Sequence, residues 1–122
     1  MKKRILLVDD HPIIRDGLRG IIDGNYEVCG EAVDGREAVR KATELKPDLI
    51  ILDFRMPKMN GIEATREIRG LLPAAKIVLM SADYASELVE KGKLAGADAV
   101  LAKLTLGREL VGVMHQLLEA KA

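Results

Sequence analysis

The chain has 122 residues, of which 48% are apolar and 31% charged, and its 19 basic and 19 acidic residues cancel. This length allows one domain with a real core and is too short for two, so residues 1–122 are predicted to form a single domain. Zero net charge and 2% aromatic residues argue against binding of nucleic acid or an anionic membrane by this domain. The single Cys29 cannot form an internal disulfide, and Ile5–Val8 is too short an apolar run for a signal peptide or membrane span, so a cytoplasmic location is expected.

Short aliphatic runs alternate with helical patterns along the whole chain. The run at 26–32 alternates apolar and polar residues and is therefore expected at a sheet edge. Strands are predicted at Ile5–Val8, Tyr26–Ala32, Leu49–Leu52, Ile77–Met80 and Ala99–Ala102. Helices are predicted from Pro12 to Ile22, around Ala38–Leu45, and over Ile62–Leu72, Tyr84–Ala95 and Gly107–Glu119. Strand then helix, five times over, specifies a doubly wound α/β fold: a five-stranded parallel sheet covered by helices on both faces.

The turn after the third predicted strand and the fourth predicted helix each contain glycine or proline residues that affect the backbone. The turn after the third strand contains Pro57, which fixes one φ, and Asn60-Gly61, a pair that tolerates positive φ. The helix at 84–95 has a thin apolar face, and Gly92 interrupts it at a cost of about 1 kcal/mol relative to alanine. This helix is therefore expected to make weak core contacts.

Polar residues stand at the carboxyl ends of four of the five predicted strands. Parallel strands place these ends at one edge of the sheet, where ligands bind in such folds. Three carboxylates there would repel one another, and Mg²⁺ is the hard cation that carboxylates, waters and phosphate oxygens bind. A carboxylate nucleophile, Mg²⁺, a cation and a hydroxyl are together the groups needed to form an aspartyl-phosphate. The residues are Asp9-Asp10, Asp53, Ser81 and Lys103.

Each of these residues also has a purely structural explanation. Asp9-Asp10 could cap the helix that follows, Asp53 could form an Asx-turn, and Lys103 could be a solvated surface lysine. Ser81 could be a turn or cap residue. His11 could ligate a metal beside the acidic pair, although we favour a role at the helix start. The joint pattern favours the phosphoryl-transfer site.

The residues resemble the receiver domain of two-component response regulators over essentially the whole chain. The matching segments are Ile5–Asp10 (ILLVDD), Pro47–Gly61 (PDLIILDFRMPKMNG), Ser81-Ala82, Gly96-Ala97-Asp98 and Lys103. The stretch from Asp9 to Leu18 is similar to the subfamily that is usually joined to a helix-turn-helix DNA-binding domain. The resemblance implies a flavodoxin-like three-layer sandwich with strand order 2-1-3-4-5.

The resemblance also implies roles for individual residues. Asp53 would be the phosphoacceptor, and Asp9 and Asp10 would lie in the Mg²⁺ pocket with the backbone carbonyl of Arg55. Ser81 and Lys103 would contact the phosphate, and Ala82 matches the small residue that keeps the phosphate site open.

The sequence departs from the family pattern at two positions. Val100 stands where the family usually has an aromatic residue that changes rotamer on activation, and Leu104 replaces the proline that commonly follows the lysine. Arg55 and Asp83 occupy positions that tune dephosphorylation, and their opposite charges suggest an ion pair across the mouth of the site.

We therefore expect a regulatory phosphoacceptor rather than an enzyme. Its phosphodonor would be a sensor histidine kinase or a small phosphodonor, and its output partner is unknown. The apolar last helix makes a phosphorylation-dependent homodimer possible.

Three alternatives stay open at this point: the receiver half of a longer DNA-binding regulator, a haloacid-dehalogenase-type phosphatase, and a flavin-binding domain. The phosphatase normally needs a second aspartate where this chain has Arg55, and the flavin-binding domain needs a hydroxyl- and glycine-rich loop after the first strand.

Overall fold

The computed structural model describes residues 2–22, 24–82 and 86–119. Strands and helices alternate along these residues in the predicted order. The strands are β1 (Lys3–Val8), β2 (Tyr26–Ala32), β3 (Leu49–Asp53), β4 (Lys76–Ser81) and β5 (Ala99–Ala102). The helices are α1 (Pro12–Ile21), α2 (Gly35–Leu45), α3 (Gly61–Leu71), α4 (Ser86–Ala95) and α5 (Leu106–Leu118), with a 3-10 turn, η1 (Lys103–Thr105), between β5 and α5.

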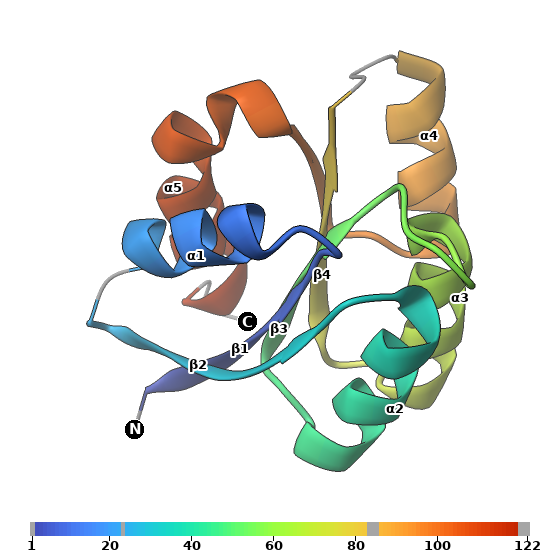
Figure 1. Cartoon of the computed structure of the whole chain (residues 1–122), viewed down its shortest axis with the longest axis horizontal. Coiled ribbons are helices and arrows are strands. Elements are labelled where there is room, and N and C mark those ends of the chain that lie inside the picture. The colour runs from blue at the N-terminus through green and yellow to red at the C-terminus, as the bar shows by residue number, and fades with distance from the viewer. Residues whose placement is uncertain (1, 23, 83–85, 120–122) are drawn as a thin grey trace.

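The five strands form one parallel sheet in the order β2-β1-β3-β4-β5. Figure 1 shows α1 and α5 on one face of the sheet and α2, α3 and α4 on the other. The predicted fold class and strand order are therefore confirmed, and β2 lies at the edge where its alternating pattern placed it. Among the described residues, no helix is both long and apolar enough to cross a membrane.

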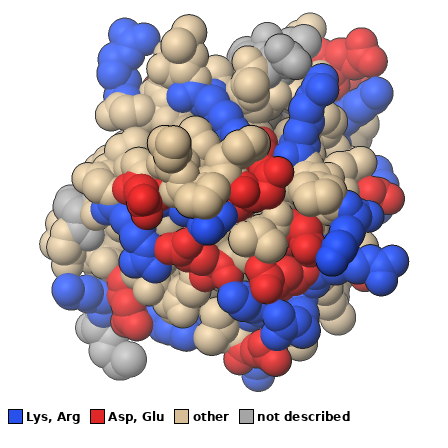
Figure 2. Space-filling model, viewed as in Figure 1, with Lys and Arg blue, Asp and Glu red and all other residues tan. Residues whose placement is uncertain are grey.

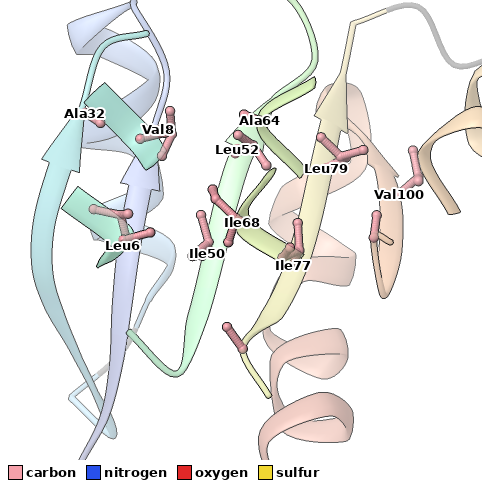
Figure 3. Packing of buried hydrophobic residues seen from close by; sticks show 14 residues of the cluster. Leu6, Val8, Ala32, Ile50, Leu52, Ala64, Ile68, Ile77, Leu79 and Val100 are labelled. Atoms are coloured by element: carbon pink, nitrogen blue, oxygen red, sulfur yellow. The ribbon is translucent and has the colours of Figure 1, made fainter. Parts of the chain in front are cut away.

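The core consists of aliphatic side chains that alternate between the two faces of the central strands, as the two-residue period of a strand requires. Figure 3 shows the layer that packs against α2, α3 and α4, with Leu6, Ile50 and Leu79 at its centre. The opposite layer, which packs against α1 and α5, contains Ile5, Leu7, Leu49, Ile51, Val78 and Met80. Because β1, β3 and β4 are buried on both faces, the ends of these strands are held rigidly.

The amino ends of α2 and α3 are capped by side chains that the sequence patterns assigned to turns. The Asp34 carboxylate accepts a hydrogen bond from the Glu37 amide at 2.8 Å. Asn60 and Glu63 form a capping box at the start of α3, with hydrogen bonds of 2.9 and 3.2 Å. Although Asn60-Gly61 tolerates positive φ, Asn60 has φ −73°, and the left-handed residue of this loop is Lys58 with φ 69°.

Gly61 is required by close packing rather than by its backbone dihedrals. A methyl group built on Gly61 would overlap the carbonyl oxygen of Asp53 and lie 2.8 Å from the Cα atom of Phe54. The start of α3 is therefore pressed directly against the end of β3, and the Gly61 amide donates to the Phe54 carbonyl at 2.8 Å.

Gly92, for which the sequence indicated only a low helix propensity, also allows close packing. A Cβ atom there would lie 2.9 Å from a methyl of Leu79 and 3.0 Å from one of Val100. Gly96 adopts φ +118° directly after the end of α4. The predicted start at Tyr84 lies outside the described residues.

The apolar positions of the two helices on the opposite face are used unequally. Leu18 of α1 is buried, whereas Ile13 is 82% exposed although it belongs to the predicted apolar stripe. In α5, Leu110 and Met114 are fully buried, and Val113, Leu117 and Leu118 are partly buried against the same core layer. A homodimer stays a prediction. Figure 2 shows acidic and basic side chains interspersed over the face that it presents.

We predict that Gly61→Ala lowers the free energy of unfolding by about 1–3 kcal/mol, because the added methyl meets backbone atoms that cannot move aside. Gly70→Ala in the same helix is the matched control, since a Cβ there meets no atom within 4 Å. The control should stabilise the protein by up to about 1 kcal/mol through helix propensity. Urea unfolding of both variants checks this, and equal effects would contradict the packing argument.

Candidate functional site

The carboxyl edge of the sheet brings the predicted residues together. Asp53 and Ser81 are the last residues of β3 and β4, and Asp9 directly follows β1. Lys103 follows β5 and opens η1. These four side chains come from segments up to 94 residues apart in sequence, yet an ion pair joins the first of them, Asp9, to the last, Lys103. The convergence that the strand pattern predicted is confirmed.

Asp9 is completely buried and is held by donors on both of its oxygens. Its Oδ1 accepts a hydrogen bond from the His11 amide at 2.9 Å, and its Oδ2 lies 3.0 Å from the Lys103 ammonium. The N-cap position of α1 is occupied by His11, so Asp9 is not the cap of that helix. Asp10 is more accessible, with 34% of its side chain exposed.

Lys103 is shared between two buried carboxylates. Its ammonium lies 3.0 Å from Asp9 Oδ2 and 3.2 Å from Asp53 Oδ2, and its side chain is only 18% exposed. The alternative of a solvated surface lysine is therefore wrong. Burial by itself would lower the pKa of Lys103, but the hydrogen bond to Asp9 and the charge of Asp53 outweigh it and raise the pKa.

The negative charge of the Asp53 carboxylate is only partly balanced by the Lys103 ammonium. Burial raises the pKa of its carboxyl group, and the nearby Asp9 carboxylate raises it further. Lys103 and a hydrogen bond from the Arg55 amide act in the opposite direction and only partly offset these effects. One ammonium therefore serves two buried carboxylates, and the site favours an additional cation.

His11 contributes more to this site than the sequence suggested. Its Nδ1 lies 2.9 Å from Asp9 Oδ1 and 3.1 Å from Asp10 Oδ1, while its backbone occupies the N-cap of α1. Ligand atoms of Asp9, Asp10, His11 and Asp53 all lie within 4.8 Å of one another. The position of His11 directly after Asp9 and Asp10 is the sequence signal for its contact with these two carboxylates. Three carboxylates in this small volume fit Mg²⁺, which prefers oxygen ligands.

A pocket of about 410 Å³ opens above Asp53, and its lining includes Asp10, Ser81, Ala82, Arg55 and Lys103. Ser81 is 2% exposed at the floor, whereas Arg55 is exposed at the rim. The predicted site residues therefore surround one hollow that is large enough for a phosphoryl group. A hollow of similar volume lies elsewhere, but Asp48 is the only carboxylate among the described residues that line it, and that side chain accepts a hydrogen bond from the Arg4 amide.

Of the other predicted tuning positions, the structure describes only Val100, which is not among the residues that line this pocket. Val100 is 7% exposed and packs in the core layer beside α4. Asp83 lies outside the described residues, so its ion pair with Arg55 stays a prediction.

We predict that Asp53→Asn raises the free energy of unfolding of the metal-free protein at pH 7. The pKa of Asp53 is higher in the folded than in the unfolded state, so ionisation penalises folding. This penalty is complete above the folded pKa and disappears as the pH falls below the ordinary value of 3.8. Denaturant unfolding between pH 7 and pH 4 should show the advantage of the variant shrinking with pH.

Asp16→Asn is the control for this prediction, because it removes the same charge from an exposed position of α1. Its effect should stay within about 0.5 kcal/mol at every pH. If both variants behaved alike, the cost of ionising Asp53 would be disproved.

Comparison with known proteins agrees with this geometry. The family model of the response regulator receiver domain matches residues 5–115. The chain is 47% identical over 104 residues to the chemotaxis protein CheY of Thermotoga maritima, covering 84% of this chain and 87% of that protein. It is 40% identical to the uncharacterized transcriptional regulatory protein YxjL of Bacillus subtilis, covering 93% of this chain and 53% of YxjL.

A solved structure agrees equally well. The crystal structure of a two-component response regulator of the LuxR family from Aurantimonas sp. SI85-9A1 superposes with a TM-score of 0.92 at 38% identity, covering 99% of this chain and 88% of that one. The strand order, the cluster of acidic residues and these similarities lead to one conclusion: the chain belongs to the response regulator receiver domain family.

Proposed function

We propose that this domain accepts a phosphoryl group on Asp53 in the presence of Mg²⁺ and thereby acts as a signalling switch. The observation that supports this most directly is the position of the Asp53 carboxylate. It lies at the end of a rigid buried strand, faces the 410 Å³ pocket and is only partly neutralised by Lys103 at 3.2 Å. A carboxylate held in this way is a fixed nucleophile beside a cation that can balance the incoming charge.

In the proposed transfer, an Asp53 oxygen attacks the phosphorus of the donor. The bond between phosphorus and the donor's leaving group breaks, and the leaving group retains the electron pair. Asp10 and Asp53 would hold Mg²⁺ together with the Arg55 carbonyl, and the buried Asp9 would complete the acidic pocket around the metal. The metal, when bound, neutralises charge on the phosphoryl oxygens.

The remaining residues would then respond to the new charge. Lys103 already contacts Asp53 and would pair with a phosphoryl oxygen, while Ser81 would supply its hydroxyl and Ala82 leaves space at the pocket rim. Val100 has no ring to change rotamer, so we propose that the face formed by α4, β5 and α5 responds through movements of Ser81 and Lys103. Arg55 and Asp83 would slow hydrolysis at the rim.

The partners follow from the same proposal. A sensor histidine kinase in the cytoplasm would supply the phosphoryl group, and phosphorylation could control a second copy or another output. YxjL is named as a transcriptional regulatory protein, and this chain spans about half of its length. We propose that a receiver of this kind regulates a DNA-binding output that lies outside the residues 1–122.

Incubation with Mg²⁺ and acetyl phosphate, followed by intact mass measurement, tests the proposed chemistry. The wild-type protein should gain the mass of one phosphoryl group, and Asp53→Asn should gain none. Omitting Mg²⁺ or adding EDTA should abolish the adduct on the wild type. Absence of any adduct on the folded wild type would overturn the proposal.

Asp48→Asn is the matched control, since Asp48 precedes the opposite end of the same strand. The side-chain oxygen of the introduced amide would still accept the hydrogen bond from the Arg4 backbone amide. This variant should be phosphorylated like the wild type. Sustained turnover of a generic phosphate ester would instead indicate a phosphatase, and we expect none.

A further inference from the structure

Arg15 joins the loop of the acidic cluster to the edge strand of the sheet. This residue lies on α1, and its side chain is only 15% exposed. Its Nη1 donates a hydrogen bond to the backbone carbonyl of Asp9 at 2.7 Å, and its Nε donates to Glu31 Oε1 on β2 at 2.6 Å. The planar guanidinium thus bridges two oxygens in a fixed geometry.

We propose that Arg15 is a positioning residue for the metal site, which orients the Asp10 carboxylate through the peptide bond between Asp9 and Asp10. This inference rests on the proposed Mg²⁺-dependent function. The Asp9 carbonyl and the Asp10 amide belong to one planar peptide unit. A donor that holds the carbonyl therefore fixes the plane from which the Asp10 side chain extends.

The two acidic residues differ in how much they need this support. The Asp9 amide donates to the Ala32 carbonyl at 3.1 Å, and its carboxylate is held by Lys103 and the His11 amide. The Asp10 carboxylate lies 3.1 Å from the His11 ring and is 34% exposed. Loss of Arg15 should therefore disturb Asp10 more than Asp9, and metal binding more than the fold.

Glu31 holds the other end of the bridge. Burial alone would raise the pKa of Glu31, but hydrogen bonds from Arg19 and Arg15 lower it, so this carboxylate stays ionised. Arg19 donates to Glu31 Oε2 at 2.5 Å and is 48% exposed. Among the described residues, Arg19 contacts Glu31, whereas Arg15 contacts both Glu31 and the Asp9 carbonyl. The two arginines therefore form a matched pair for comparison.

Removal of Arg15 should change the Mg²⁺ affinity in opposite directions if Arg15 acts only through its charge or if it positions a metal ligand. Deleting a positive charge close to a cation site should strengthen Mg²⁺ binding. Loss of a residue that orients a metal ligand typically weakens metal affinity by about 10–100-fold. A weaker affinity would therefore separate positioning from a general charge effect.

Isothermal titration with MgCl₂ on wild type, Arg15→Ala and Arg19→Ala tests the inference. We expect the Mg²⁺ dissociation constant of Arg15→Ala to rise at least about 10-fold. The constant of Arg19→Ala should stay within about twofold of wild type. Thermal unfolding in EDTA is the companion readout, because a merely structural role would lower the melting temperature without changing the affinity of the folded protein.

The outcomes separate this inference from the proposed function. A folded wild type that binds no Mg²⁺ would overturn both. A wild type that binds Mg²⁺, with equal affinities in the two variants, would overturn only the role of Arg15. If Arg15→Ala does not fold, the pair Arg15→Lys and Arg19→Lys decides in the same way, since one ammonium cannot reproduce the two-oxygen bridge.

Discussion

The site depends on two buried carboxylates sharing one ammonium. Lys103 contacts both Asp9 and Asp53 within 3.2 Å, in a place that water reaches poorly. Removing charges from water is costly unless they are paired, and here the pairing is incomplete. The raised pKa of Asp53 expresses this deficit. The same deficit makes the edge of the sheet attractive to a metal cation and, with that cation, to a phosphoryl group.

The fold keeps these charges in place through its backbone. The strands that end in Asp53 and Ser81 are buried on both faces, and Gly61 allows α3 to begin directly against the end of β3. The loop between β3 and α3 ends in the capping box of Asn60 and Glu63. Asp53, as the proposed nucleophile, would therefore need little reorganisation when a reaction partner arrives, because its orientation would not have to be selected from many rotamers.

The opposite side of the acidic loop is supported by charge. Arg15 and Glu31 connect α1 and the edge strand β2 to the Asp9 carbonyl. The proposed metal site is thus held by packing on the β3 side and by a hydrogen-bonded ion pair on the β2 side. On the far side of the sheet, Gly92 brings α4 close to Val100, so a small residue and an aliphatic side chain make the contact between α4 and β5.

The sequence by itself determined the fold class, the strand order through the family resemblance, and the convergence of Asp9, Asp53, Ser81 and Lys103. It could do so because strand period, helix spacing and the direction of parallel strands are local properties of the chain. Only the tertiary structure decided which atoms share a charge, that His11 touches both carboxylates, and that Arg15 reaches Asp9. It also showed that Gly61 and Gly92 lie where an added Cβ atom would meet neighbouring atoms. These features depend on contacts between distant segments, whose side-chain distances no local pattern encodes.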